Sequence, residues 1–346
     1  MVSFRCGITA SLIFSLFGSI RAVPLGEKLK RLSLPARDLL KRTTPAAPRF
    51  LAYNDKYLNP LPTPSDLQVS KNADSTSCKC LLDDACGASN PNFSALTFLL
   101  ASSSVDEAQN WQELTASQRS TYLSEYNAAG ISLIVSAFGS TEAPTSSGLD
   151  PVNTANSIAS WVTTYGVLGV DVDYEDFTAF NSADGSAETW LISFTTQLRT
   201  QLPQGEYILT HAPVAPWFSP SIWSGGGYLA IDKSVGSLID WYNVQFYNQG
   251  ATEYTTCAGL LTASSSVWPE TALFQISVNG VSLDKLVIGK PGTTADASNG
   301  YIDPSTLATC VAQAASMGWD AGVMVWQYPD VNSSWIETVR GSTFPV

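Results

Sequence analysis

The chain has 346 residues, of which 45% are hydrophobic and 14% are charged, and its formal net charge is −12. This length and apolar content suit a globular protein of one large or two small domains and exclude a disordered chain. Because an acidic surface repels phosphates and anionic lipids, we expect neither nucleic acid nor a membrane as a partner.

The first 22 residues have the pattern of an export signal. Arg5 supplies the positive charge, an apolar stretch follows over residues 8–17, and Ala22 offers a small residue for cleavage. The apolar stretch is shorter than the about 20 residues that span a bilayer. We therefore expect a secreted, extracellular protein.

Residues 23–42 are basic and end in the pair Lys41-Arg42. This pattern predicts a pro-segment that is removed during secretion, and a basic helix kept in the mature protein is the alternative. Loss of residues 1–42 removes eight basic and only two acidic residues, so the remainder is more acidic than the whole chain. We expect residues 43–346 to form a single domain.

From residue 50 onward, short apolar runs alternate with longer amphipathic stretches. The runs predict strands over residues 50–53, 95–100, 132–138, 168–175, 207–211, 241–247, 286–289 and 322–327. The clearest helices are predicted over residues 116–128, 154–165, 188–201 and 304–317. Eight strands separated by helical stretches predict a (β/α)₈ barrel. A doubly wound open sheet is the alternative, although no Gly-x-Gly-x-x-Gly follows the first strand.

Five cysteines follow the export signal, namely Cys78, Cys80, Cys86, Cys257 and Cys310. Their spacing contains no Cys-x-x-Cys pair and the chain has one histidine, so we expect no metal site and no cofactor. Secretion favours disulfides instead, one within the first three cysteines and one between Cys257 and Cys310, with one thiol left over. Asn92 and Asn332 begin glycosylation sequons, each of which could be unused.

Residues 169–176 read Gly-Val-Asp-Val-Asp-Tyr-Glu-Asp. Alternate side chains of a strand share a face, so Asp171, Asp173 and Glu175 are expected to point the same way at the end of the fourth strand. Neighbouring buried carboxyls repel one another and resist desolvation, which is typical of a site that holds and moves a proton. A cation site or a set of loop caps is the alternative. In a (β/α)₈ barrel, catalytic groups lie at this end of the strands.

This segment resembles the signature Asp-x-x-Asp-x-Asp-x-Glu of glycoside hydrolase family 18, which contains chitinases and endo-β-N-acetylglucosaminidases. The match holds at Asp171, Asp173 and Glu175 and fails at the first position, which is Leu168. Three further segments resemble family motifs in the same order along the chain. They are residues 136–139, 245–248 and 322–326, on the third, sixth and eighth predicted strands.

The resemblance implies a glycosidase in which Glu175 is the general acid and the 2-acetamido oxygen of the substrate is the nucleophile. Asp173 would bind the acetamido N–H, and Asp171 would share a proton with Asp173. Tyr247 would donate to the acetamido carbonyl, and Trp326 would form the apolar floor below the sugar ring.

Five more residues near the ends of predicted strands are candidates for binding substrate: Gln245, Asn248, Tyr53, Phe98 and His211. Structural roles are the alternative for several of them. Gln245 and Asn248 could satisfy backbone groups at the rim, and a lone histidine usually makes structural hydrogen bonds.

Leu168 is the one departure from the family signature. Because a leucine removes a negative neighbour, it predicts a lowered pKa for the Asp171/Asp173 pair, with catalysis weakened but retained.

We therefore expect a monomeric, secreted hydrolase that cleaves β-1,4 linkages next to N-acetylglucosamine in chitin or chitooligosaccharides. An endo-β-N-acetylglucosaminidase acting on N-glycan cores would share the same catalytic residues and remains an alternative. A non-catalytic lectin or inhibitor that binds chitin or another glycan is a further alternative, which the presence of Glu175 disfavours.

Overall fold

The computed structural model describes residues 46–58, 60–64 and 92–345. The predicted export signal, the predicted pro-segment and Cys78, Cys80 and Cys86 lie outside these residues. Within the described part of the chain, no helix is long and apolar enough to cross a bilayer.

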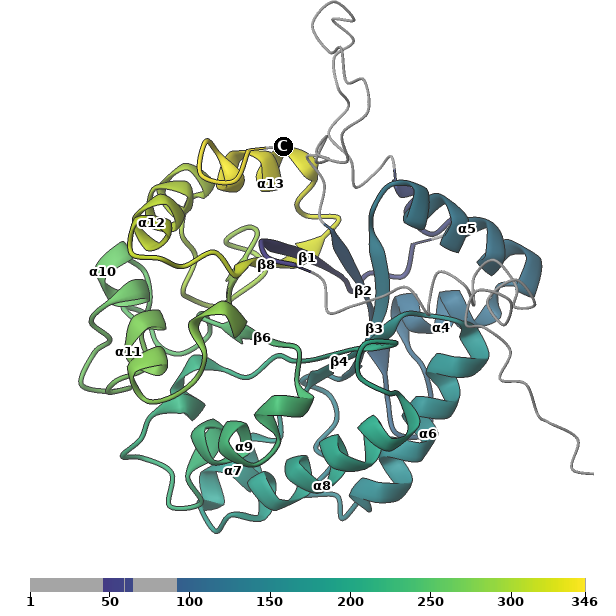
Figure 1. Cartoon of the computed structure of the whole chain (residues 1–346), viewed down its shortest axis with the longest axis horizontal. Helices are drawn as coiled ribbons and strands as arrows, with labels where there is room; N and C mark the ends of the chain where they lie inside the picture. Colours follow the sequence, from purple (N-terminus) through teal and green to yellow (C-terminus); the bar gives the residue numbers. More distant parts are fainter. Residues whose placement is uncertain (1–45, 59, 65–91, 346) are drawn as a thin grey trace, which may run out of the picture.

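Eight parallel strands follow one another around a closed barrel, and helices surround it (Figure 1). The strands are β1 (Arg49–Asn54), β2 (Phe93–Leu99), β3 (Ser132–Phe138), β4 (Gly169–Asp173), β5 (Ile208–His211), β6 (Trp241–Gln245), β7 (Leu286–Pro291) and β8 (Gly322–Tyr328). The predicted (β/α)₈ barrel is therefore confirmed. Two strands end two residues earlier than predicted, β4 at Asp173 and β6 at Gln245.

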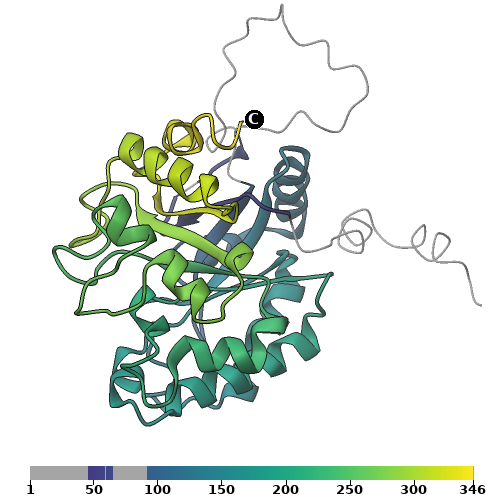
Figure 2. The ribbon, with the colours of Figure 1, turned by 60° about the vertical axis from the view of Figure 1, so that its left-hand side comes forward.

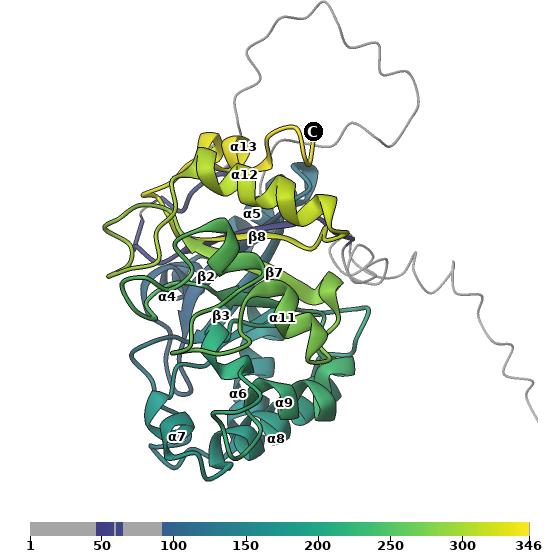
Figure 3. The same ribbon diagram turned by 90° about the vertical axis from the view of Figure 1, so that its left-hand side faces the viewer.

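The helices occupy the connections between strands and form an outer ring around the barrel (Figures 2 and 3). They are α4 (Asp106–Glu113), α5 (Ala116–Ala128), α6 (Pro151–Tyr165), α7 (Phe177–Ser182), α8 (Ser186–Gln201), α9 (Gly227–Val235), α10 (Cys257–Leu261), α11 (Leu273–Val278), α12 (Pro304–Ser316) and α13 (Ser333–Arg340). The four helices predicted from the sequence correspond to α5, α6, α8 and α12.

Local sequence explains where these helices begin and end, as α6 illustrates. The Asp150 side chain accepts a hydrogen bond from the Asn153 N–H, and Pro151 occupies the first helical position. The helix stops at Gly166, which has a φ of 77°, a conformation that glycine adopts without steric cost.

The barrel interior changes from apolar to polar along the strands. At the amino ends, the rings of Phe93 and Trp241 lie 4.9 Å apart, and the Arg49 guanidinium covers Trp241 at 4.9 Å. Further along the strands, the inward positions are polar. Asp171 on β4 lies beside Thr210 on β5, and the two side chains form a hydrogen bond. The closed apolar end supports the strands, so the polar groups at their carboxyl ends have fixed positions.

Asn92, the first of the two sequons, is a structural residue. Its Oδ1 accepts from the Phe50 N–H at 2.6 Å, and its Nδ2 donates to the Pro48 carbonyl at 2.9 Å. These bonds tie the start of β1 to the residue before β2. A glycan on Nδ2 would have to fit against this backbone, so the sequon at Asn92 is poorly placed for glycosylation.

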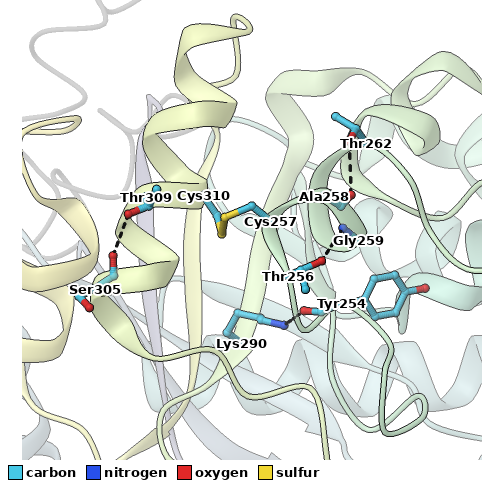
Figure 4. The surroundings of a disulfide bond; sticks show 10 residues. All are labelled: Tyr254, Thr256, Cys257, Ala258, Gly259, Thr262, Lys290, Ser305, Thr309 and Cys310. Carbon is cyan, nitrogen blue, oxygen red and sulfur yellow. Dashed lines mark hydrogen bonds between the residues drawn. A yellow bond between two sulfur atoms is a disulfide. The ribbon is translucent and has the colours of Figure 1, made fainter.

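Cys257 and Cys310 form a disulfide, as the sequence predicted (Figure 4). The bond joins the first residue of α10 to the middle of α12. Lys290 on β7 lies nearby and donates to the carbonyls of Phe246 and Tyr254, at 2.7 and 2.8 Å. Burial holds the pKa of Lys290 well below its usual range. Together, the disulfide and Lys290 fix the chain that leads from β6 to α10.

Replacement of both Cys257 and Cys310 by alanine is expected to lower the free energy of unfolding by about 2–4 kcal/mol, because the cross-link no longer restricts the unfolded chain. The bond spans a sequence separation of 53 residues, which places the effect in the upper part of that range. Urea unfolding monitored by circular dichroism measures it. An unfolding midpoint equal to that of the oxidised wild type would contradict the expectation.

Candidate active site

Three carboxyl side chains lie together at the carboxyl end of β4, and we call Asp171, Asp173 and Glu175 the carboxyl row. Asp171 and Asp173 lie on the strand and are 0% and 3% exposed. Glu175 lies two residues beyond the end of β4, where it is partly exposed and hydrogen-bonds with Asp173. The shared orientation predicted for the three side chains is thus observed, although Glu175 is not part of the strand.

Asp171 is the most deeply buried member of the row, and four side chains donate hydrogen bonds to it. The hydroxyls of Tyr53 and Ser136 bind Oδ2 at 2.6 and 2.8 Å. Thr210 and the Asn243 amide bind Oδ1, the latter at 2.9 Å. Burial raises the pKa of Asp171, and the donors, which favour the ionised carboxylate, oppose that rise. Asp171 is therefore a fixed acceptor beneath the other two carboxyls.

Asp173 and Glu175 form a coupled pair. Burial raises the pKa of Asp173 well above its usual range, and the charges of Glu175 and Asp171 raise it further. Burial also raises the pKa of Glu175, while hydrogen bonds from Gln245 and Asp173 oppose that rise. Because neighbouring buried carboxylates resist ionising together, the pair retains a proton at a pH where an exposed carboxyl has lost it.

Gln245 on β6 orients this pair. Its Nε2 donates to Asp173 Oδ1 at 2.8 Å and to the Ala212 carbonyl at 2.9 Å, and it lies 3.5 Å from Glu175 Oε1. The prediction that Gln245 faces the site is consistent with this geometry. Its role within the protein is to hold the carboxyls.

Gln245→Leu is expected to move the alkaline limb of the pH–rate profile to higher pH. The substitution removes donors that favour the ionised forms of Asp173 and Glu175, so the pKa values of both carboxyls rise. An acid catalyst is active while protonated and loses activity as the pH rises through its pKa, so a higher pKa extends activity towards neutral pH. The profile of kcat/KM against pH measures the shift, and a limb that stays in place or moves to lower pH would contradict it.

Aromatic side chains surround the carboxyl row. Tyr247 is buried, and its pKa is raised well above the usual range, first by burial and then by the charges of Asp173 and Glu175. Its phenol therefore stays protonated. Partly exposed Trp326 on β8 stacks on Phe98 with ring centroids 5.9 Å apart.

Tyr53 on β1 completes this group. Its ring centroid lies 5.8 Å from that of Trp326, while its hydroxyl binds Asp171. The structure thus brings Tyr53, Phe98, Tyr247 and Trp326 together around the carboxyls.

His211 lies outside the site, contrary to the sequence-based expectation. Its neighbour Thr210 faces the barrel interior and binds Asp171, so alternation along β5 directs His211 towards the helices. There its ring nitrogens lie 3.2 Å from the hydroxyls of Thr195 on α8 and Tyr228 on α9. Burial lowers the pKa of His211 to about 3, so the imidazole is neutral and structural.

Asn248 is also structural rather than part of the site. It is exposed and has a φ of 61°. Its Oδ1 accepts from the backbone N–H and the hydroxyl of Ser298, at 2.8 and 3.0 Å. Asn248 therefore joins the loop after β6 to the loop after β7, which was the alternative role considered for it.

The structure places Leu168 just before β4. It alternates with Asp171 and Asp173, and its side chain belongs to the hydrophobic core. A carboxyl at this position would not join the carboxyl row. The effect of the leucine on the pKa values of the row and on catalysis stays a prediction.

Three polar residues of the site were not predicted from the sequence. Thr210 and Asn243 bind Asp171. Asn243 shares the inward alternation of the predicted Gln245, two positions later, whereas Thr210 alternates with the predicted His211. Asp55 follows β1 and accepts from the Thr97 hydroxyl at 3.0 Å. Burial raises the pKa of Asp55 to about 6, and its charge contributes to the raised pKa of Asp173. The sequence signal that could have revealed Asp55 is its position directly after a predicted strand, where barrel enzymes carry site residues.

Two curated proteins are similar in sequence. The endochitinase of Saccharomyces cerevisiae is 28% identical over 186 residues, which are 51% of this chain and 27% of that protein. The class III chitinase of Arthroderma benhamiae is 26% identical over 210 residues, which are 60% of this chain and 54% of that protein. The matches thus span about a quarter and about half of these relatives. No family model matches the chain.

Solved structures share the fold. A family 18 chitinase from Pseudoalteromonas aurantia is 24% identical with a TM-score of 0.62, covering 84% of this chain and 99% of that one. A family 18 chitinase variant from Cycas revoluta in complex with (GlcNAc)₄ is 13% identical with a TM-score of 0.59, covering 86% of this chain and 100% of that one.

The closed barrel with the carboxyl row at the end of β4 defines a (β/α)₈ domain whose candidate site lies at the carboxyl ends of the strands. Both sequence relatives are chitinases by name, and the structures that share the fold include chitinases of glycoside hydrolase family 18. The chain is thus similar to chitinases in sequence and to family 18 chitinases in fold.

Proposed function

We propose that the protein is a retaining glycosidase that hydrolyses β-1,4 linkages next to N-acetylglucosamine in chitin or chitooligosaccharides. The observation that carries this proposal is the neighbouring pair of Asp173 and Glu175, both contacted by Gln245 Nε2, next to the buried Asp171. The similar chitinases, one of them in complex with (GlcNAc)₄, support this substrate class.

Glu175 is the member of the pair that can reach substrate, because it is partly exposed while Asp173 is buried. In the proposed first step, the single proton that the pair retains moves from Asp173 to Glu175, which leaves Asp173 ionised. Glu175 gives this proton to the glycosidic oxygen, and the bond from that oxygen to C1 of the sugar breaks. The acetamido oxygen of the same sugar attacks C1 and closes a cyclic oxazolinium-type intermediate. Water then opens the ring at C1 and returns a proton to Glu175, so C1 keeps its configuration.

Asp173 and Tyr247 would hold the acetamido group during these steps. An ionised Asp173 accepts from the acetamido N–H, which stabilises the positive charge of the cyclic intermediate. The Tyr247 phenol, which remains protonated, donates to the acetamido oxygen. Trp326, held by its contacts with Phe98 and Tyr53, offers an aromatic face to the sugar ring.

Product analysis by mass spectrometry tests the proposal. Incubation with chitotetraose is expected to release shorter oligomers of N-acetylglucosamine, whereas a high-mannose glycoprotein is expected to remain intact. Release of whole glycans from the glycoprotein would instead indicate an endo-β-N-acetylglucosaminidase. Binding of chitotetraose without turnover would indicate a lectin.

We further propose that the protein is secreted as a monomer that is cleaved after Arg42 and carries a glycan at Asn332. Asn332 is exposed, and its Oδ1 accepts from Ser334, while its Nδ2 has no hydrogen-bond partner among the described residues. Expression in a eukaryotic secretory host is expected to yield an N-terminus at residue 43 and a carbohydrate mass on the peptide that contains Asn332. An unmodified Asn332 would contradict the proposed glycosylation, and an N-terminus upstream of residue 43 would contradict cleavage after Arg42.

A further inference from the structure

A cavity lies outside the barrel, between the loop that follows β2 and the helices α4 and α6. Its volume is about 340 Å³, within the range of about 300–1,000 Å³ that is usual for ligand pockets. It is lined by Leu99 at the end of β2, residues 100–103 of the loop, Gln112 of α4, and Ser157, Ile158 and Trp161 of α6. We call it the outer groove.

Trp161 gives the outer groove a fixed aromatic wall. Its indole N–H donates to Gln112 Oε1 at 2.7 Å, and Tyr165 packs against it with ring centroids 4.8 Å apart. Two contacts therefore hold the ring, which is still partly exposed. A ring that is already immobilised loses little conformational entropy when a ligand stacks on it.

The remaining wall is polar but uncharged. Gln112 Oε1 accepts from both Trp161 and the Ser104 hydroxyl, which fixes the amide, while its Nε2 has no acceptor among the described residues. The side chains of Ser102, Ser103 and Ser157 are exposed. None of the residues that line the outer groove is charged. An aromatic face with hydroxyl and amide groups and without charge suits a neutral, hydroxyl-rich ligand, which is the chemistry of a sugar chain.

The outer groove and the candidate active site both include residues of β2. Phe98, near the end of this strand, stacks on Trp326, and the next residue, Leu99, begins the wall of the outer groove. One strand end therefore contributes to both places.

We propose that the outer groove is a secondary binding site for a segment of a neutral β-linked N-acetylglucosamine polymer. Stacking on Trp161 and hydrogen bonds from Gln112 and the serines would hold the chain and increase the time that the protein spends on an insoluble substrate. This inference rests on the proposed function for the identity of the sugar.

Adsorption of the full chain to colloidal chitin tests the inference, with Ser157→Arg and Ser160→Arg as a matched pair. Both serines are exposed on α6 and both changes add one positive charge, but only Ser157 lines the outer groove. Arginine is a good helix former, so neither change is expected to disturb α6. Both variants carry Glu175→Gln as well, so that the polymer is not consumed during the measurement.

Ser157→Arg is expected to weaken adsorption by about 2–12-fold relative to Ser160→Arg, the range expected for loss of one aromatic contact. Trp161→Ala is expected to weaken adsorption similarly, and Ser157→Arg keeps the test valid if that variant does not fold. Equal adsorption of the matched pair would overturn the inference.

The failure of this inference and that of the proposed function are distinguishable, because the wild-type protein is assayed in parallel on soluble chitotetraose. Turnover of chitotetraose together with equal adsorption of the matched pair would refute sugar binding in the outer groove and leave the proposed function intact. Absence of both turnover and adsorption would overturn the proposed function and, with it, the assignment of a sugar to the outer groove.

Discussion

Glu175→Gln is expected to lower kcat/KM for chitotetraose by about 10²–10⁴-fold, the usual contribution of general acid catalysis. Glutamine keeps the size of the side chain but cannot give a proton to the leaving oxygen. Because Glu175 is partly exposed, the variant is expected to fold and to retain binding of the oligosaccharide. Initial rates give the loss, and calorimetric titration with chitotetraose separates it from a loss of binding.

Glu125→Gln provides the matched control for this experiment. Glu125 is exposed on α5, in the outer ring of helices, and the substitution makes the same chemical change. Its activity is expected to equal that of the wild type. A Glu175→Gln protein with activity within tenfold of the wild type would refute Glu175 as the general acid, and the proposed mechanism would be abandoned.

Asp171→Ala is expected to lower the free energy of unfolding by about 3–5 kcal/mol, because it leaves several buried donors without an acceptor, each costing about 1–3 kcal/mol before the site relaxes. Tyr53, Ser136, Thr210 and Asn243 all direct a hydrogen to this one carboxyl. The variant is also expected to lose activity, since Asp173 is positioned above Asp171. Urea unfolding measures the first effect, and the initial rate on chitotetraose measures the second.

Tyr53→Phe distinguishes the contribution of the whole network from that of a single bond. It removes one donor and leaves the carboxyl with three, so the expected cost is about 0.5–1.5 kcal/mol. If Asp171→Ala were as mild as Tyr53→Phe, the carboxyl would not be the centre of the network.

The strands could be predicted because their apolar runs are short and separated by helical stretches, and this pattern depends only on local sequence. The ends of β4 and β6 were placed too late, since Tyr174 and Phe246 continue the apolar alternation beyond the last residue of each strand. Burial in the surrounding core accounts for these two aromatic residues. The apolar pattern therefore located the strands correctly but not the residues at which β4 and β6 end.

The carboxyl row could be predicted because its spacing is tied to the two-residue period of one strand. The error at His211 has a different origin, because the side of the barrel that a strand residue faces depends on its register with the neighbouring strand. Asn248 lies beyond the end of β6, where the two-residue alternation of the strand no longer applies. Once Thr210 is paired with Asp171, His211 must face the helices. A register between two segments that are far apart in the chain is not encoded in the local pattern.

The cross-link between α10 and α12 has a consequence for affinity as well as for stability. With Lys290 it anchors the chain that follows β6, so the Tyr247 phenol is in place before any ligand arrives. Under reducing conditions the loosened segment would have to be ordered at each encounter with a sugar, and that entropic cost would weaken complex formation. Thiol reagents should therefore raise the dissociation constant for chitotetraose at temperatures where the barrel itself is still intact.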